Sequence, residues 1–406
     1  MRPAITMKIV YPYPTYWPYV RRGVERCIHD LSNYLASRGH EVDIITSKPG
    51  QPRIGHDGLA RVIYLRQLAH PLAYKYLPHF RLYSFGAEAT SVLLREKYDV
   101  AHLWAYSSIM AAPLLKRWKN LPYLFHLMLR DHIWPGRFDH WVFNRLMKHA
   151  NSVAALTPGG AANMQRATGI DVKTIPPPVD MQTFKPNGTK DLKNPRVLFT
   201  GDLGDARKGG PALLRAWDEV HRAIPEAKLV LAGPFGMIGY DSRFDVYTLE
   251  RMDLIRSPAA RAAVEVPGPG AVKDLPARYS EAAVTVLPSV EEAFGIVVTE
   301  SLSCGTPVVC SSYDGPGEIV TNPEVGVTVP LKTLVDLMSE SSSQQLAQAI
   351  IKAIELARQP QTSERCRQWA EQYSLDTIGP LVENELMAMA ENRHSRSGSE
   401  LVGALA

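Results

Sequence analysis

The chain has 406 residues, of which 45% are hydrophobic and 21% charged, and its formal net charge is +4. A single hydrophobic core stops growing at about 250 to 300 residues, so the length predicts two domains, and the composition excludes disordered and fibrous classes. No run of about 18 uncharged apolar residues occurs, which excludes a spanning helix, and no secretory leader is indicated, so we expect a cytoplasmic protein.

Elements in the first half alternate between short apolar runs and amphipathic helices. Strands are predicted at 7–12, 41–46, 60–65, 99–104, 122–127 and 152–157, with a helix at 23–39 and further helices between the later strands. This alternation is typical of a parallel α/β sheet. Residues 1–185 therefore form the predicted first domain.

A second α/β series follows a segment rich in Pro, Gly, Asn and Lys at 175–195, which is predicted to be a linker. Strands are predicted at 196–201, 227–233, 264–268, 284–289 and 306–311, spaced as in a doubly wound sheet. The second domain is thus expected at 190–375. Helical patterns continue to 392, and 393–406 is expected to be a loose tail.

Charge is distributed unevenly between the halves. Residues 1–185 carry 24 Lys and Arg against 12 Asp and Glu, a balance of +12, and the remainder carries 21 against 29, a balance of −8. This asymmetry predicts that the first half meets an anionic surface or acceptor, although a chance imbalance explains it as well. The four cysteines show no metal-ligand spacing and no disulfide framework, so free thiols are expected.

The stretch EEAFGIVVTE, at 291–300, places carboxylates at both ends of an apolar run that starts a predicted helix. Ligands of open parallel sheets bind beyond the carboxyl ends of strands, so Glu292 is expected at the mouth of a crevice. The first amides of the helix, at Gly295, Ile296 and Val297, would attract a phosphate, and Glu300 would accept two ribose hydroxyls. The alternative is that Glu292 caps the helix and Glu300 is an exposed helix residue.

The run PSVEEAFGIVVTESLSCGTPVV (288–309) closely resembles the donor-site signature of glycosyltransferase family 4. That signature is a Glu, a Phe-Gly pair and a second Glu, here Glu292, Phe294, Gly295 and Glu300. Weaker similarity extends along nearly the whole chain. The resemblance implies the GT-B fold, in which two Rossmann-like domains face each other across a cleft, with the first domain binding acceptor and the second binding donor. It also implies that the C-terminal helix at 376–392 packs back on the first domain.

The stretch RVLFTGDLGDARKGG (196–210) resembles the phosphate-binding loop of the family, with Lys208 in its Lys-Gly position. The family usually has Gly-Arg where this chain has Gly201 and Asp202, so one cation for the diphosphate is missing. Arg207 is predicted to supply that charge. A solvated basic turn is the alternative interpretation of Arg207 and Lys208.

In the first domain, His126 lies at the end of a predicted strand and is identified with the active-site histidine of the family, which would contact the transferring sugar. A buried core histidine is the alternative. The Gly-Gly of the family is replaced by Arg22 and Gly23, which form the predicted acceptor-side loop. The segment at 137–150 combines apolar and basic residues and is predicted to be either a membrane-surface helix or a core helix.

The resemblance implies retaining transfer of a sugar from a nucleotide-sugar donor to a carbohydrate, lipid-linked or small-molecule acceptor, by front-face substitution and without a metal or cofactor. The chain contains no Asp-x-Asp triplet, as this expectation requires. We expect a cytoplasmic enzyme that either remains in solution or lies peripherally on an anionic membrane, and no nucleic-acid partner. The alternatives are a non-catalytic protein that binds nucleotide sugars or polyanions, and another GT-B enzyme such as a phosphorylase, hydrolase or epimerase.

Overall fold

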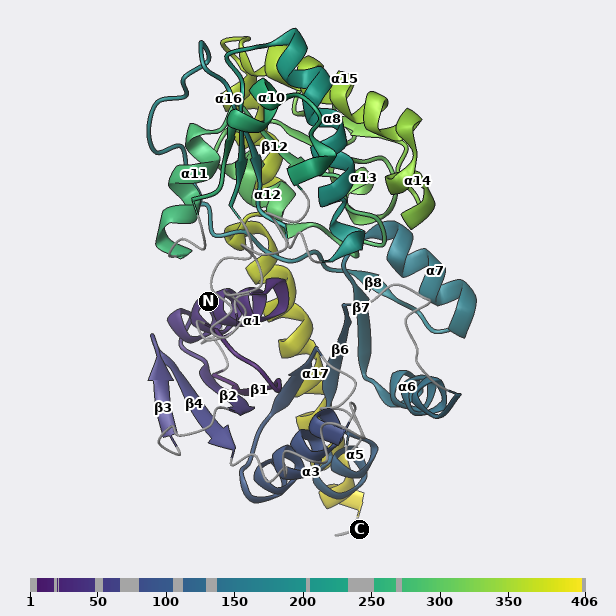
Figure 1. Cartoon of the computed structure of the whole chain (residues 1–406). Helices are drawn as coiled ribbons and strands as arrows, with labels where there is room; N and C mark the ends of the chain where they lie inside the picture. Colours follow the sequence, from purple (N-terminus) through teal and green to yellow (C-terminus); the bar gives the residue numbers. More distant parts are fainter. Residues whose placement is uncertain are drawn as a thin grey trace. The chain divides into compact units, whose positions relative to one another are not determined.

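The chain divides into two compact units in a computed structural model that describes residues 6–17, 20, 22–47, 54–65, 80–104, 112–128, 137–201, 205–232, 252–267 and 272–403. Unit 1 comprises Met1–Pro18, Arg22–Pro178 and Leu375–Ala406. Unit 2 comprises Tyr19–Arg21 and Val179–Ser374. Each unit is an α/β structure built around one sheet (Figure 1).

The sheet of unit 1 has the strand order β3-β4-β2-β1-β5-β6-β7-β8, and all of its pairs are parallel except β3 with β4. Side chains of β5, β6 and β7 pack on helices α3, α5 and α6 in one core. The elements are β1 (Lys8–Pro12), α1 (Gly23–Ser37), β2 (Glu41–Ser47), β3 (Ile54–Asp57), β4 (Ala60–Leu65), α3 (Phe80–Arg95), β5 (Val100–Leu103), α5 (Ala112–Lys119), β6 (Tyr123–Leu127), α6 (Arg137–His149), β7 (Ser152–Ala155), α7 (Pro158–Thr168), β8 (Lys173–Thr174) and α17 (Leu375–Gly403).

The sheet of unit 2 is parallel throughout, in the order β11-β10-β9-β12-β13-β14. Its regular elements are β9 (Arg196–Phe199), η1 (Ala206–Lys208), α8 (Gly210–Ala223), β10 (Lys228–Leu231), η2 (Met252–Leu254), α10 (Pro258–Ala262), β11 (Val264–Glu265), η3 (Val272–Asp274), α11 (Leu275–Glu281), β12 (Val284–Leu287), α12 (Ile296–Ser303), β13 (Val308–Ser311), α13 (Asp314–Ile319), β14 (Gly326–Val329), α14 (Leu334–Met338), α15 (Glu340–Ala357), α16 (Thr362–Ala370) and η4 (Glu371–Tyr373). Helices α8 and α15 pack together over this sheet, and α12 packs against α11 and α16.

In each sheet there is one point at which the strand order reverses, so that successive strands are added on opposite sides of it. In unit 1, α1 leads from β1 to one side of the sheet, and α5 leads from β5 to the other side. In unit 2 the same reversal lies between β9 and β12. Ligands of open α/β sheets bind in the crevice beyond the carboxyl ends of the two strands that flank such a reversal. The fold therefore marks one candidate crevice in each unit.

The boundary between the units differs from the predicted one at 185. Residues from Val179 onward belong to unit 2, because Val179 N–H donates to the Tyr373 carbonyl at 2.8 Å and Phe184 is buried in a cluster with Tyr279. The predicted loose tail is also wrong in its first part. Helix α17 continues to Gly403, and the Arg393 guanidinium donates to the backbone carbonyls of Tyr98 and Lys119.

Helix α17 packs on α1 and against β5 and β6 within unit 1 (Figure 1). The carboxylate of Glu383 anchors it there. Glu383 is 8% exposed and accepts hydrogen bonds from His40 Nε2 at 3.1 Å and from Arg38. His40 Nδ1 accepts from the Met7 amide, so its Nε2 carries the proton that is donated to Glu383. Both ring nitrogens of His40 are therefore hydrogen-bonded, one to the Met7 amide and the other to Glu383.

We expect Glu383→Ala to lower the free energy of unfolding by about 2 kcal/mol, because it leaves a buried imidazole N–H without a partner. Urea unfolding of the purified variant measures this. Glu385→Ala is the matched control on the same helix, since Glu385 pairs with a half-exposed Lys173 and its loss is expected to cost less than about 0.5 kcal/mol. Equal losses in the two variants would show that Glu383 is not the anchor.

Candidate active site

The candidate site of unit 2 lies where β9 and β12 end, and two loops meet there. The loop after β9 turns through η1, which carries Arg207 and Lys208, and the loop after β12 carries Glu292. The Val290 amide donates to the Arg207 carbonyl at 2.8 Å and joins the two loops. Gly209, at φ +73°, lets them approach, because a Cβ there would lie 2.4 Å from the Pro288 carbonyl oxygen.

Lys208 and Glu292 form an ion pair. The Lys208 Nζ lies 2.5 Å from Glu292 Oε2, and the two side chains are 31% and 20% exposed, so both are reachable from solvent. Arg207 is held by Asp205, which also accepts the Arg207 amide. Burial acts to raise the pKa of Asp205, but the hydrogen bonds from Arg207 outweigh it and lower that pKa. Two cations are thus positioned at one crevice.

The N-terminus of α12 lies beside this pair. Gly295 is the N-cap residue at φ +94°, and Ile296 and Val297 begin the first turn, whose N–H groups have no intrahelical acceptors. The side chain of Phe294, in contrast, is 3% exposed and packs edge-on against Tyr373 at 5.7 Å, so it supports the loop from inside the core. Of the predicted donor residues, the backbone at 295–297 is the part suited to an anion.

Glu300 lies on α12 with 7% of its surface exposed, which corrects the alternative that it is an exposed helix residue. Its Oε2 accepts from the Tyr279 hydroxyl at 2.9 Å. Burial raises the pKa of Tyr279 well above its ordinary value, so the phenol remains a donor and orients the carboxylate. Tyr279 could not be recognised as this partner from the sequence, because α11 and α12 meet only in the folded chain.

Backbone strain also marks the loop after β12. Glu291 adopts φ +56°, and Asp314, at the start of α13, adopts φ +59°. The Gly315 amide donates to the Glu292 carbonyl at 3.1 Å, and a Cβ at Gly315 would lie 2.3 Å from the Phe294 Cα. Residues held in such unfavourable conformations cluster at binding sites. Gly315, which was not predicted from the sequence, thus holds the loop that carries Glu292.

Of the remaining donor residues, Gly201 is buried at the end of β9, and Asp202 lies outside the described residues. Among the residues that the structure describes, no group of three His, Cys, Asp or Glu side chains is arranged to hold a metal ion. Within the same described ranges, no helix is long and apolar enough to cross a membrane.

In unit 1 the structure favours the alternative interpretation of His126, a buried core histidine, over a contact with the sugar. His126 is an interior residue of β6, is 0% exposed, and has both ring nitrogens occupied. Its Nε2 donates to the Ile175 carbonyl at 2.8 Å, and its Nδ1 accepts from His102 Nε2 at 3.2 Å. Burial lowers the pKa of His126 to about 4, against a smaller opposing effect of the Ile175 carbonyl. His126 is thus a neutral core residue with no atom free for substrate in this conformation.

The acceptor-side loop begins α1. Arg22 is its N-cap residue, in an extended conformation and without a side-chain cap hydrogen bond, and Gly23 is the first helical residue. Glu25, in the first turn, is 1% exposed and accepts from the Thr15 hydroxyl at 2.6 Å. Burial raises the pKa of Glu25. The helix start is therefore joined to the segment that follows β1.

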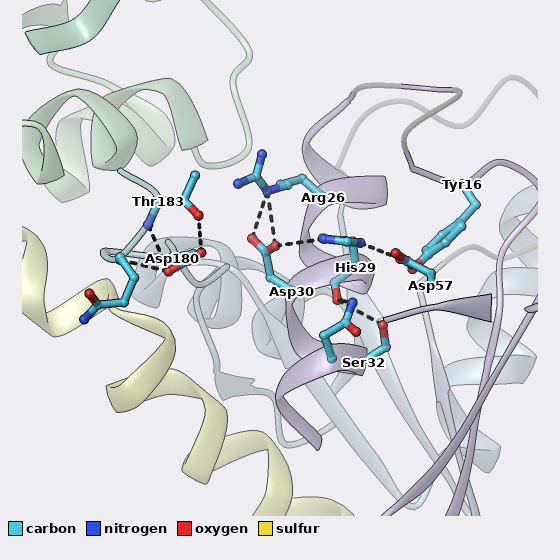
Figure 2. A network of polar contacts seen from close by, with 10 residues as sticks. Tyr16, Arg26, His29, Asp30, Ser32, Asp57, Asp180 and Thr183 are labelled. Carbon is cyan, nitrogen blue, oxygen red and sulfur yellow. Dashed lines mark hydrogen bonds and ion pairs between the residues drawn. The ribbon is translucent and has the colours of Figure 1, made fainter. Parts of the chain in front are cut away.

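The same segment is held from its other side by Asp57, at the end of β3. Figure 2 shows Tyr16 and His29 directed at the Asp57 carboxylate, whose Oδ2 lies 2.5 Å from each of them. The Arg26 guanidinium stacks over the Trp17 ring at 4.8 Å. These contacts fix the segment after β1 on α1 and on the β3–β4 hairpin.

We expect Asp57→Asn to lower the free energy of unfolding by about 1 kcal/mol at neutral pH. Burial acts to raise the pKa of Asp57, but the hydrogen bonds from His29 and Tyr16 outweigh it, so the folded pKa lies below the ordinary 3.8. A lowered carboxyl pKa stabilises the fold above the ordinary pKa, and this stabilisation is lost as the pH falls through the folded pKa. The difference between wild type and variant should therefore disappear in acid, and a difference that grows in acid would contradict the assignment.

The predicted membrane-surface helix corresponds to α6. Phe143, Leu146 and Met147, its apolar residues with described side chains, are at most 3% exposed and pack in the core of unit 1. The side chains at 137–142 lie outside the described residues. For the described part of α6, the core-helix alternative is correct, because its apolar face already has a partner.

Comparison with known proteins identifies both halves of the chain. A family model described as "Glycosyl transferases group 1" matches residues 180–373, and one described as "Glycosyltransferase Family 4" matches residues 21–183. The chain belongs to glycosyltransferase family 4. The predicted family, enzyme class and GT-B fold are thereby confirmed.

Relatives of this glycosyltransferase include D-inositol 3-phosphate glycosyltransferase of Paenarthrobacter aurescens (strain TC1), which is 25% identical over 76% of this chain and 80% of its own. An uncharacterized glycosyltransferase of Methanocaldococcus jannaschii is 28% identical over 80% and 85%. Among solved structures, sucrose-phosphate synthase from Thermosynechococcus elongatus aligns with a TM-score of 0.75 at 22% identity, covering 94% of this chain and 99% of that one. Anabaena HepE in complex with UDP and glucose aligns with a TM-score of 0.69 at 19% identity, covering 94% and 100%.

Proposed function

We propose that this glycosyltransferase moves a sugar from a nucleoside diphosphate sugar to an acceptor hydroxyl, with retention of anomeric configuration and without a metal ion. The observation that carries the proposal is the meeting of Lys208, Glu292 and the N-terminus of α12 at the strand reversal of unit 2. A diphosphate, a sugar and a ribose require cations, hydroxyl acceptors and amide donors close together, and this crevice supplies all three.

Each residue has a chemical role in this proposal. Loss of a nucleoside diphosphate develops negative charge on the departing oxygen, and preorganised positive groups lower the barrier by stabilising it. Lys208, Arg207 and the amides at 295–297 are the groups assigned to that oxygen and its phosphates. Glu292 accepts hydroxyls of the transferred sugar, and Glu300, oriented by Tyr279, accepts those of the ribose. The acceptor hydroxyl attacks the anomeric carbon from the side on which the diphosphate departs. Its oxygen forms the new glycosidic bond while the bond from that carbon to the phosphate oxygen breaks, and its proton passes to the departing phosphate oxygen, so the configuration is preserved.

The ion pair of Lys208 with Glu292 has a consequence for donor binding. Each partner neutralises the other before the donor arrives, and each is assigned to a different part of the donor. The diphosphate would take over Lys208 while a sugar hydroxyl donates to Glu292, so both partly exposed charges would keep a partner throughout.

The names of similar proteins decide which substrates to test first. Structures of HepE are titled as complexes with UDP and with UDP-glucose, and several relatives are named D-inositol 3-phosphate glycosyltransferase. Thermal shift with UDP-, GDP- and ADP-glucose ranks the donors, since a bound ligand stabilises by RT ln(1 + [L]/Kd). Transfer is then assayed to inositol phosphate, to free sugars and to lipid-linked sugars.

Nuclear magnetic resonance of the first product distinguishes retention from inversion. Retention with activity that survives EDTA supports the proposal, whereas inversion, or a loss restored by Mg²⁺, contradicts the mechanism. Binding of a nucleotide sugar without transfer to any acceptor would favour a non-catalytic role. Peripheral membrane association, suggested by the basic first half, is tested separately by sedimentation with anionic vesicles.

A further inference from the structure

The strand reversal of unit 1 lies between β1 and β5 and has features that the donor site does not use. A crevice beyond the ends of these strands is where a ligand of unit 1 would bind. The first residue after β5 is Trp104, which is 3% exposed. Because unit 2 accounts for the donor, this inference rests on the proposed function in assigning unit 1 to the acceptor.

Trp104 carries an unsatisfied donor. Its indole Nε1 is buried and makes no hydrogen bond to the described part of the chain. A buried N–H without a partner is unfavourable, and most such groups in native proteins are satisfied by protein, water or ligand. Trp217 and Trp369, in unit 2, follow the rule, because their indoles donate to the carbonyls of Ala260 and Ile319. Among these three buried or half-buried indoles of the described residues, Trp104 is the one without an internal acceptor.

Near Trp104, the side chains of Tyr11, His102 and His126 form a row in which each hydrogen-bonds to the next. Since the Ile175 carbonyl can only accept, His126 must donate through Nε2 and accept through Nδ1, and His102 must donate to it through Nε2. His102 Nδ1 then accepts from the Tyr11 hydroxyl at 3.1 Å. Trp104 stacks on His126, with ring centroids 4.1 Å apart. Both imidazoles are neutral in this arrangement, and the indole N–H remains as the unused donor next to the row.

We propose that the Trp104 Nε1–H donates to an uncharged oxygen of the acceptor, a hydroxyl of a sugar or polyol. The row beneath it contributes no positive charge, so a phosphate or carboxylate placed there would lose its hydration without compensation. A hydroxyl oxygen needs only one donor and restores the missing hydrogen bond. Trp104 would thereby bind a part of the acceptor that carries hydroxyl groups, and a charged part of the acceptor would lie elsewhere.

The test compares Trp104→Phe with Trp217→Phe in the full-length protein. Both substitutions remove one indole N–H and keep an aromatic ring, but only Trp217 has an internal partner. We expect Trp217→Phe to lower the melting temperature of the ligand-free protein more than Trp104→Phe does, because only Trp217→Phe also breaks an internal hydrogen bond. Calorimetric titration with glucose, sucrose and myo-inositol as probes, in the presence of saturating UDP, measures binding without requiring turnover.

The expected result is that wild type binds at least one of these uncharged probes, that Trp104→Phe binds it at least about tenfold more weakly, and that Trp217→Phe binds it normally. Equal affinity in wild type and Trp104→Phe, or no binding of any uncharged probe by wild type, would overturn the proposal. So would binding of inorganic phosphate that Trp104→Phe weakens. Donor binding and donor hydrolysis are measured on the same samples, so a failure of the proposed function is seen separately.

Discussion

Lys208→Met is expected to lower kcat by about 10²- to 10³-fold, equivalent to roughly 2.7 to 4 kcal/mol of transition-state stabilisation, by analogy with the loss of one oxyanion donor. The substitution keeps an unbranched apolar side chain of nearly the same length and removes the ammonium group, with its charge and its hydrogen-bond donors. The effect should appear mainly in kcat, because negative charge on the leaving diphosphate is greatest in the transition state. Steady-state kinetics with the donor that gives the largest thermal shift measures it.

The matched control is Lys228→Met. Lys228 also forms a Lys–Glu ion pair in unit 2, with Glu265 at 2.9 Å, but it lies at the start of β10, at the amino edge of the sheet. Its loss should leave kcat within about twofold of wild type, since a surface ion pair contributes little. Near-normal turnover by folded Lys208→Met would remove Lys208 from the proposed mechanism. Glu292→Gln, alone and combined with Lys208→Met, measures the coupling of the pair.

The local part of the donor site could be predicted from the sequence. Glu292 and Glu300 are only eight positions apart on one loop and helix, so strand, loop and helix patterns suffice to place them at one strand end. The partner of each carboxylate could not be predicted in the same way. Lys208 and Tyr279 come from other loops and helices, and the order of strands decides which of these meet. The resemblance, and not periodicity, singled out Lys208.

The two interpretations of His126 could not be separated in the sequence for a physical reason. All five residues of β6 are buried, because a central parallel strand is covered on both faces, and such a strand shows no alternation that tells a core position from a site position. A histidine there is equally compatible with a ligand contact and with an internal hydrogen bond. The partners of His126 are on β5 and after β8, so only the fold reveals that its nitrogens are occupied.

His126→Ala is accordingly expected to act on stability, with a loss of about 3 to 5 kcal/mol in the free energy of unfolding. The substitution opens a cavity under the Trp104 ring and leaves the His102 N–H and the Ile175 carbonyl without partners. Urea unfolding measures the loss, and the slope of the transition should remain that of wild type.

Activity per folded molecule separates this role from a catalytic one. At a temperature where both proteins are folded, His126→Ala should keep the donor KM of wild type and lose far less than the 10²-fold in kcat expected for Lys208→Met, because no His126 atom is available to the sugar. His126→Gln, which can still donate to the Ile175 carbonyl, should recover part of the stability. A fully folded His126→Ala with wild-type stability and a hundredfold loss of kcat would mean that the ring reaches the sugar in the working enzyme, and that the hydrogen bonds to His102 and Ile175 break during turnover.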